Sequence, residues 1–402
     1  MTGSNLAQFR RVALDAVRRA TNVCVSVQQQ LTGASGVTKG DASPVTAADL
    51  AAQAIVSDCL WRTWPRARIV AEEDSSQIRA DAELRRLVAR LADVGDEAHV
   101  VALLEQRSAV SVADASDEPF YWVLDPVDGT KGFLRGDQFA VCLALMDGRT
   151  HRPVLAVLSC PKWTADGLLL VAERGRGTTS EPLGTVVRVN SVVDAEQLLV
   201  TQSLDSSTRN VDEISAVLAH LGVKRATLPI DSATKYALVA CGHASMYLRM
   251  PNRADYFEKV WDHAAGVLVL EEAGGVVTDI NGAPLDFSHG RTLAKNRGIL
   301  ATNGADLHQR ALAAIAASCV APIALTPPQD FECCGNGCEP CVFEVHDMRM
   351  TEHANLWKEY QRRMAIRGLS VDATAAPTPP STPSRLSAFE EFERQLKANN
   401  NG

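Results

Sequence analysis

The sequence predicts an α/β protein followed by a C-terminal segment of different composition. From residue 1 to about 320, helical patterns alternate with short apolar runs of strand length, and no long linker interrupts them. The composition changes at the segment APIALTPPQD and stays different to the end of the chain. A length of 402 residues, 46% of them hydrophobic and 22% charged, suits a soluble globular protein of two or three domains.

The expected elements follow one another in order along the chain. The first helix is indicated by apolar residues at helical spacing: Leu6, Phe9, Val12, Ala13, Ala16 and Val17. Further helices are expected at 47–60, 80–92, 210–221, 262–273 and 304–317. The expected strands are ARIVAEE, FYWVLD, FAVCLALMDG, PVLAVLSC, SMYLRM and GGVVTDI.

Charge and hydropathy exclude two classes of partner. A formal net charge of −8 argues against a nucleic-acid polymer, because such a partner needs a basic surface. No apolar run approaches the roughly 20 residues of a membrane helix. The arginines and scarce acids near the N-terminus also suit a mitochondrial presequence. Helical spacing favours a structural helix there, so a cytoplasmic protein is expected and a mitochondrial one is the alternative.

Acidic residues stand at the ends of four expected elements. They are Asp49, Glu72 with Glu73, Asp125 with Asp128, and Asp262. One such acid usually caps a helix, but four favour a hard divalent cation, since Mg²⁺ prefers carboxylate oxygens, water and phosphate. Ions that share carboxylates can stabilise both oxygens of an in-line displacement. In PVDGT, backbone N–H groups at a helix start could bind phosphate, with Gly129 permitting a close approach.

These residues also carry a family resemblance over about residues 5–320. AEE, DPVDGTKGF and WDHAAG resemble, in order, the motifs of the lithium-sensitive, magnesium-dependent phosphatases. That superfamily includes inositol monophosphatases, fructose-1,6-bisphosphatases and 3′(2′),5′-bisphosphate nucleotidases. Ala71 stands where the family usually has glycine, and it is small enough that activity is expected to be kept.

The resemblance implies a fold, a metal site and a reaction. The fold would be the layered αβαβα sugar-phosphatase fold, with an α+β lobe over 1–190, an α/β lobe over 191–320 and the active site between them. Two or three Mg²⁺ ions would be bound by Glu72, Asp125, Asp128, Asp262 and the carbonyl of Val127. Asp49, Glu72 and Thr130 would position and activate water, which attacks phosphorus directly, and lithium would inhibit.

A narrower resemblance concerns the substrate. The segments VTKGDASPVTAADLAAQ, PLDFSHGRTL and the long stretch from DSATKY to WDHAAG resemble the bisphosphate nucleotidase branch. This implies hydrolysis of adenosine 3′,5′-bisphosphate (PAP), and of phosphoadenylyl sulfate (PAPS), in sulfur assimilation. The expected substrate-binding residues are Thr130, Ser232, Lys235, Arg249 and Asp262. Two alternatives stay open, namely an inositol phosphate phosphatase and a catalytically weak PAP sensor that acts through the C-terminal segment.

Within that narrower resemblance, Ser232, Lys235 and Arg249 are expected to bind the second phosphate. The alternative is that Lys235 and Arg249 form ordinary ion pairs. Strand alternation places Arg249 on the face of Tyr247, opposite Met246, Leu248 and Met250. The segment SLDSSTRN offers Thr208 where the branch often has histidine, which leaves the contacts to the base open. His263 is expected to cap or pack rather than to replace it.

The C-terminal segment contains a second candidate metal site. Cys333, Cys334, Cys338 and Cys341 lie within nine residues, and such thiolates could bind zinc or an iron–sulfur centre. Redox-sensitive or purely structural thiols are the alternatives. With a charged helix at about 344–367, a Pro/Thr linker at 371–384 and a short terminal helix, residues 328–400 resemble the small oxidoreductase-like domain, whose protein partner is unknown. Truncation after Val320 is therefore expected to leave an active phosphatase.

Overall fold

The computed structural model describes residues 3–33, 44–108, 119–204, 210–319 and 342–370. The chain forms two compact units, one of Met1–Val320 with Ile366–Gly368 and the other of Ala321–Ala365 with Leu369–Gly402. Within the described part of the chain, no helix is both long enough and apolar enough to cross a membrane.

The first sheet of the larger unit has seven strands in the order β1-β2-β3-β4-β5-β6-β7. They are β1 (Ile69–Ala71), β2 (Phe120–Asp128), β3 (Ala140–Asp147), β4 (Pro153–Cys160), β5 (Leu168–Glu173), β6 (Gly177–Glu181) and β7 (Thr185–Val187). β1 pairs with β2 in parallel, and the other neighbours are antiparallel. Because consecutive strands are mostly neighbours, short hairpins connect most of this sheet.

The second sheet has five strands in the order β11-β12-β10-β8-β9. They are β8 (Val200–Gln202), β9 (Leu228–Pro229), β10 (Met246–Arg249), β11 (Val276–Thr278) and β12 (Ile299–Thr302). Its central strand β10 runs parallel to β8 and antiparallel to β12. All strands of the first sheet precede those of the second in sequence, while the predicted lobe boundary at 190 stays a prediction.

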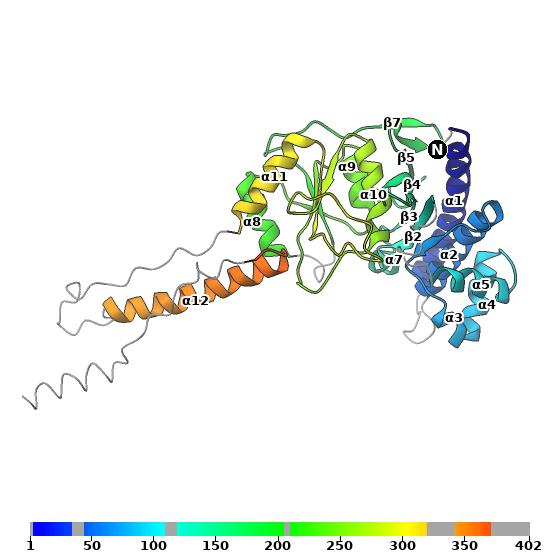
Figure 1. Cartoon of the computed structure of the whole chain (residues 1–402), viewed down its shortest axis with the longest axis horizontal. Coiled ribbons are helices and arrows are strands. Elements are labelled where there is room, and N and C mark those ends of the chain that lie inside the picture. The colour runs from blue at the N-terminus through cyan, green and yellow to red at the C-terminus, as the bar shows by residue number, and fades with distance from the viewer. Residues whose placement is uncertain (1–2, 34–43, 109–118, 205–209, 320–341, 371–402) are drawn as a thin grey trace, which may run out of the picture. The chain divides into compact units, whose positions relative to one another are not determined.

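Helices cover both faces of each sheet, so the larger unit is a five-layer αβαβα structure (Figure 1). The helices of these layers are α1 (Gly3–Gly33), α2 (Pro44–Thr63), α8 (Val211–Leu221), α9 (Thr234–Ala240), α10 (Val260–Glu272) and α11 (Ala305–Ala317). α1 and α2 pack on the outer face of the first sheet, and α8 and α11 lie on the outer side of the second. α9 and α10 fill the middle layer. This confirms the predicted layered α/β fold.

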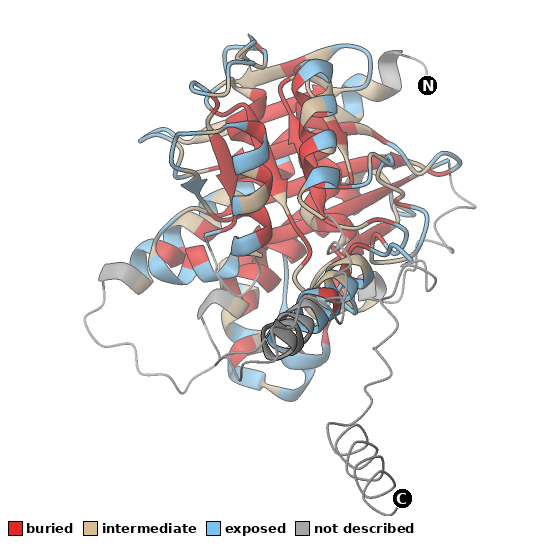
Figure 2. Cartoon of the chain, turned by 90° about the vertical axis from the view of Figure 1, so that its left-hand side faces the viewer, coloured by how far each residue is buried: buried red, intermediate tan, exposed pale blue. Residues whose placement is uncertain are grey.

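Strand alternation divides the core among these layers. On β2, Trp122 and Leu124 pack with α1 and α2, whereas Tyr121 and Val123 face the α9 and α10 layer. Buried residues, red in Figure 2, run along the strands and the inner helix faces. The period-2 pattern therefore fixes which face of each strand meets which helices.

Most of the expected elements are present. The five helices predicted between residues 47 and 317 correspond to α2, α4 (Ala82–Ala92), α8, α10 and α11, and the first predicted helix extends to Gly33. Local sequence patterns did not predict α3 (Ser76–Ala80), α5 (Glu97–Ser108), α7 (Thr130–Arg135), α9 or six of the strands. These elements are short, or lack one clear apolar face, so their periodicity is weak.

The described residues include six cysteines, which differ in burial. Cys24, Cys59, Cys142 and Cys160 are buried, while Cys241 and Cys319 are partly exposed.

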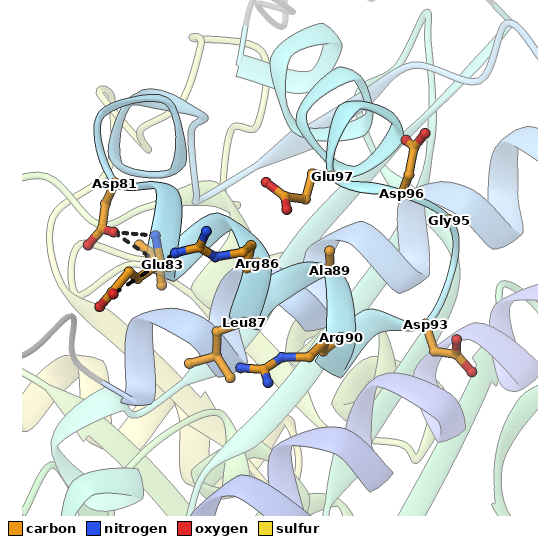
Figure 3. A pocket seen from close by; sticks show the side chains of 11 residues that line it. Asp81, Glu83, Arg86, Leu87, Ala89, Arg90, Asp93, Gly95, Asp96 and Glu97 are labelled. Atoms are coloured by element: carbon orange, nitrogen blue, oxygen red, sulfur yellow. Dashed lines mark hydrogen bonds and ion pairs between the residues drawn. The ribbon is translucent and has the colours of Figure 1, made fainter.

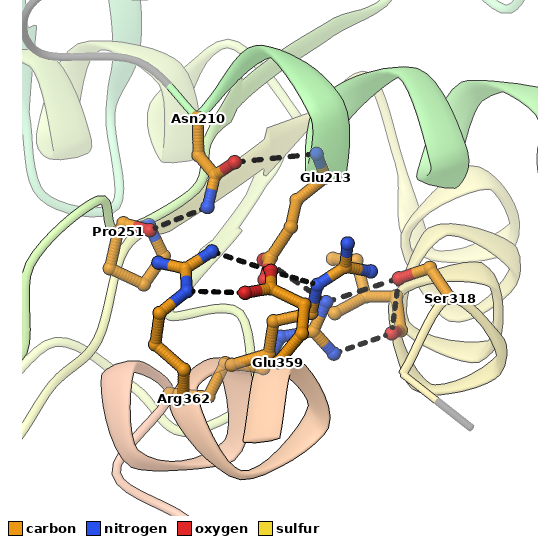
Figure 4. Close-up of polar contacts among 9 residues, drawn as sticks. Asn210, Glu213, Pro251, Ser318, Glu359 and Arg362 are labelled. Carbon is orange, nitrogen blue, oxygen red and sulfur yellow. Dashed lines mark hydrogen bonds and ion pairs between the residues drawn. The ribbon is translucent and has the colours of Figure 1, made fainter. Parts of the chain in front are cut away.

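The larger unit includes a short segment from the far C-terminal part of the chain. Arg367 is 2% exposed, and its Nη2 lies 3.2 Å from Oε2 of Glu213, which is 1% exposed. Arg367 also donates from Nη1 to the carbonyl of Ile315 at 2.9 Å and from Nη2 to Oγ of Ser318 at 3.1 Å. Figure 4 shows Glu213 at the start of α8, where its backbone N–H is bonded to the capping residue Asn210.

The second unit contains one described helix, α12 (Val342–Ile366), which matches the charged helix predicted at about 344–367. Glu359 accepts hydrogen bonds from Arg362 at 2.7 Å and from Arg363 at 2.9 Å, one turn along the helix (Figure 4). Such pairs support the exposed face of a charged helix. The predicted cysteine cluster, linker and terminal helix lie outside the described residues.

Candidate active site

The two aspartates of DPVD are brought to the same side of the first sheet by a β-bulge. Asp125 pairs with Cys142 and Asp128 with Ala140, so three steps along β2 oppose two steps along β3. In a regular strand, residues three apart face opposite sides, and one extra residue corrects this. Pro126 lacks a backbone N–H and is suited to a bulge. The sequence predicted that this strand ends at Asp125. In the structure it continues to Asp128.

Helix α10 adds a third carboxylate from the middle layer. Asp262 lies in its first turn, and carboxylate oxygens of Asp125, Asp128 and Asp262 lie within 4.8 Å of one another. Asp128 also accepts a hydrogen bond from the backbone N–H of Ala233, just before α9. Residues far apart in the sequence thus form one acid cluster.

Glu72 and Asp49 lie beside this cluster. β1 pairs Ala71 with Leu124, so Glu72 follows its strand next to Asp125. Asp49 comes from α2, is 4% exposed, and its Oδ1 is buried without a hydrogen-bond partner among the described residues. A buried carboxylate oxygen with no donor is expensive unless a cation or a water satisfies it.

The electrostatics of the cluster are those of acids held together out of water. Burial, followed by the neighbouring carboxylates, raises the pKa of Asp125, Asp262 and Asp49 well above the ordinary value. Burial and Asp128 likewise raise the pKa of Glu72. Like charges at this spacing disfavour ionisation of all the acids together. The donor set is oxygen only and rich in carboxylates, which fits a hard divalent cation.

The PVDGT segment shapes the edge of this cluster. Val127 is fully buried and donates its N–H to Oδ1 of Asp125 at 3.1 Å, and Oγ1 of the exposed Thr130 lies 3.5 Å from the Val127 carbonyl. Gly129 has φ of 91°, and a Cβ there would lie 2.9 Å from Cβ of Ser232. Glycine is therefore required both by the backbone conformation and by the approach of the loop before α9.

Ser232 and Lys235 lie at the start of α9, and their hydrogen bonds are to their own loop. Ser232 has φ of 67°, and its hydroxyl is hydrogen-bonded to Oγ1 of Thr234 at 2.7 Å. Lys235 is 5% exposed and donates to the carbonyl of Ser232 at 2.7 Å. Burial lowers the pKa of Lys235 to about 8, although Asp128 acts in the opposite direction.

Arg249 lies on the predicted face of β10, but its partner was not predicted from the sequence. Met246, Leu248 and Met250 pack toward α8 and α11, and Tyr247 packs toward the middle layer. Nε of Arg249 donates to Oε1 of Glu258 at 2.6 Å.

Glu258 continues this contact into a buried network. Its Oε2 lies 3.4 Å from Nε2 of His263, and Nδ1 of His263 is 2.8 Å from the hydroxyl of Tyr236. Arg249 lowers the pKa of Glu258 to about 2 against the effect of burial, with His263 contributing. His263 is thus packed and hydrogen-bonded. Arg249 forms an ion pair with Glu258, so any role of Arg249 in binding substrate would be in addition to this pair.

Gln53 supports the AEE segment, and the sequence did not predict it as a site residue. It is fully buried on α2, one turn after Asp49, and its side-chain amide makes two bonds to the backbone of Glu73. Nε2 donates to the Glu73 carbonyl at 2.8 Å, and the Glu73 N–H donates to Oε1 at 3.2 Å. The spacing of four from Asp49 was the available signal, because it places both side chains on one helix face.

A large cavity elsewhere is not lined by any predicted site residue. The cavity in Figure 3 has a volume of about 1060 Å³ and lies beside α4 and α5, with Arg86, Arg90 and Glu97 in its lining. At its edge, Asp81 caps α4 by accepting the N–H groups of Glu83 and Leu84. This arrangement of exposed charges is an ordinary solvated helix surface.

Two predictions cannot be placed in the structure. Thr208, which stands where the bisphosphate nucleotidase branch often has histidine, lies outside the described residues. The same holds for Cys333, Cys334, Cys338 and Cys341.

Known proteins of similar sequence and fold match most of this chain. The protein-family model described as "Inositol monophosphatase family" matches residues 5–320 of this chain. A 3′(2′),5′-bisphosphate nucleotidase of Emericella nidulans is 36% identical over 330 residues, covering 73% of this chain and 93% of that protein. The protein of the same name from Dictyostelium discoideum is 35% identical over 323 residues, covering 75% and 95%. A solved inositol monophosphatase from Anabaena (Nostoc) sp. PCC 7120 gives a TM-score of 0.54 at 25% identity, covering 78% of this chain and 97% of that one.

Proposed function

Since the chain belongs to the inositol monophosphatase family, we propose that it is a magnesium-dependent 3′(2′),5′-bisphosphate nucleotidase. Its substrate would be PAP, converted to AMP and phosphate in sulfur assimilation, with PAPS as a second substrate. The choice of substrate rests on relatives named for this activity, which align over more than nine-tenths of their own length. The choice of reaction rests on the acid cluster.

We assign the metal ligands to Glu72, Asp125, Asp128, Asp262 and the carbonyl of Val127, which would hold two or three Mg²⁺ ions. Carboxylate oxygens of three of these residues, Asp125, Asp128 and Asp262, lie within 4.8 Å of one another. A set of oxygen ligands rich in carboxylates suits Mg²⁺. Bound ions would polarise the phosphoryl oxygens and favour deprotonation of a water.

The attacking water would be oriented by Asp49, Glu72 and Thr130. Its oxygen forms a bond to the 3′ phosphorus in line with the P–O3′ bond, which breaks. The water would give up one proton, and the carboxylate pair of Asp49 and Glu72 would accept it. The 3′ oxygen takes up a proton from solvent and leaves as the ribose hydroxyl. The buried Oδ1 of Asp49, which has no hydrogen-bond partner among the residues that the structure describes, supports a role for that residue in holding this water or its proton.

Phosphate release from PAP and from inositol 1-phosphate, measured with the full chain and Mg²⁺, tests the function. We expect kcat/KM to favour PAP by about 30-fold or more, because the monophosphate lacks a charged group worth at least about 2 kcal/mol. Release should stop with a chelator. A preference for inositol 1-phosphate would establish the alternative phosphatase, and PAP binding without release from either compound would establish the sensor.

Arg249, with Ser232 and Lys235, would face the second phosphate, while Thr130 and Asp262 would face the phosphate that is cleaved. For Arg249→Ala we expect a loss of about 2–4 kcal/mol in PAP binding, as for a truncated charge pair, and a much smaller loss for a monophosphate. Glu258→Gln, which leaves the guanidinium in place, is the matched control in the same binding titration. Equal losses for both ligands would make Arg249 only the structural partner of Glu258.

Two further assignments extend the proposal. We expect a cytoplasmic location, which cell fractionation tests. The cluster of Cys333, Cys334, Cys338 and Cys341 would bind zinc or an iron–sulfur centre. Elemental analysis of the anaerobically purified chain against its four-Cys→Ser variant decides this, and equal metal contents would contradict it.

A further inference from the structure

Backbone hydrogen bonds link the segment around Arg291 to the residues at the start of α10. The N–H of Val260 donates to the Arg291 carbonyl at 3.1 Å, and the N–H of Leu293 donates to the Glu258 carbonyl at 2.8 Å. Lys259 and Thr292 form an isolated β-bridge between these two bonds. The position of Arg291 is therefore fixed relative to the first turn of the helix that carries Asp262.

The side chain of Arg291 extends from this anchor to the end of β1. Its guanidinium carbon lies 4.5 Å from the ring centroid of Trp261, which is 4% exposed. Its Nη2 donates to the backbone carbonyl of Glu72 at 2.9 Å. A planar guanidinium can stack on an indole while donating in its own plane, which an ammonium group cannot do.

These contacts connect the end of β1 with the start of α10. The two elements belong to different layers, and each carries a proposed metal ligand. Trp261 immediately precedes Asp262, and the carbonyl that Arg291 holds belongs to Glu72. The next residue, Glu73, is held from the opposite element by Gln53 on α2. The backbone after β1 is thus hydrogen-bonded at two successive residues, Glu72 and Glu73, by side chains from different elements.

We propose that Arg291 is a positioning residue that sets the separation of Glu72 and Asp262 and thereby strengthens divalent-cation binding. This role rests on the proposed function, because it takes the acid cluster as the metal site. Residues that orient metal ligands commonly change metal affinity by 10–100-fold when they are replaced.

The sign of the effect separates positioning from charge. A cation beside an acid cluster repels a divalent ion, so removal of a purely electrostatic Arg291 would tighten metal binding. Removal of a positioning Arg291 loosens the ligands and weakens metal binding.

Arg297 provides a matched control from the same region. Its guanidinium carbon lies 4.1 Å from the ring centroid of Phe257, and its Nη1 donates to the carbonyl of Tyr256 at 3.2 Å. It has the same combination of stacking and carbonyl bonding as Arg291. Both of these contacts stay within residues 256–257, before α10.

The experiment is a titration of Mn²⁺ into the metal-free full chain, without nucleotide, for wild type, Arg291→Ala, Arg291→Lys and Arg297→Ala. We expect about tenfold or weaker Mn²⁺ binding in Arg291→Ala, incomplete rescue by Arg291→Lys, and wild-type affinity in Arg297→Ala. Mg²⁺ half-activation should rise in parallel, while the KM for PAP at saturating Mg²⁺ stays close to wild type.

Unchanged or tighter Mn²⁺ binding in Arg291→Ala would overturn the inference, as would an equal loss in Arg297→Ala. Full rescue by lysine would also overturn it, because an ammonium group cannot combine the stack on Trp261 with the bond to the Glu72 carbonyl, and that combined contact would then not be needed. A wild-type chain that binds no Mn²⁺ would contradict both this inference and the metal assignment. A chain that binds Mn²⁺ but releases no phosphate from PAP would contradict the proposed function alone.

Discussion

Asp125→Asn is expected to lower turnover roughly a thousandfold while raising the thermal midpoint of the metal-free protein. The activity falls because a neutral ligand gives up several kcal/mol of metal-derived transition-state stabilisation. The stability rises because Asp125 is 1% exposed and carries a charge disfavoured by burial and by the neighbouring acids. Opposite signs for activity and metal-free stability are typical of a metal ligand and not of a structural cap.

The measurement pairs phosphate release with thermal unfolding, each with and without Mg²⁺. Ligand bound only to the folded state stabilises it by about 2.7 kcal/mol at 100 times the Kd, so Mg²⁺ should raise the wild-type midpoint and leave that of Asp125→Asn nearly unchanged.

Asp147→Asn is the matched control for this measurement, since Asp147 ends the neighbouring strand β3. Its Oδ1 accepts the N–H groups of Arg149 and Thr150 at 3.1 and 2.8 Å. That variant should lose a little stability and keep both activity and the Mg²⁺ effect. Wild-type turnover by a folded Asp125→Asn chain would refute the ligand assignment.

Arg367→Ala is expected to lower the free energy of unfolding of the larger unit by about 3–5 kcal/mol, the usual cost of breaking a buried ion pair from one side. The variant leaves the carboxylate of Glu213 buried beside the vacated space, and it also removes the bonds to Ile315 and Ser318. Denaturant unfolding of the full chain measures the change.

Two further variants sharpen this result. Lys224→Ala, which removes an exposed pair with Glu196 at 2.5 Å, should cost less than about 1 kcal/mol. The double variant Glu213→Leu/Arg367→Leu should recover most of the loss, because it leaves no buried charge. A small effect of Arg367→Ala, similar to that of Lys224→Ala, would mean that the pair does not anchor this segment.

This anchor changes the expectation for truncation after Val320. The predicted boundary removes Ile366–Gly368, which the structure groups with the larger unit. The truncated chain would keep all the proposed catalytic acids, but it would have Glu213 without Arg367. We therefore expect an active but less stable phosphatase.

The sequence alone determined the features that depend on local pattern. Helical and strand periodicities predicted α2, α8, α10, α11 and the buried strands, because each of these elements packs a continuous apolar face. The same period of two assigned Arg249 to the face of Tyr247. The acids of the candidate site were identified from their motifs, in which the residues that matter lie only a few positions apart.

Only the tertiary structure decided how distant segments meet. The bulge that aligns Asp125 with Asp128 depends on the register with β3, and the arrival of Asp262 depends on the packing of α10 against the first sheet. The partners of Arg249, Arg291 and Arg367 lie 9, 219 and 154 positions away. Such pairs, near or distant in the sequence, leave no trace in a local periodicity, because a charged side chain selects its partner by proximity in the folded chain.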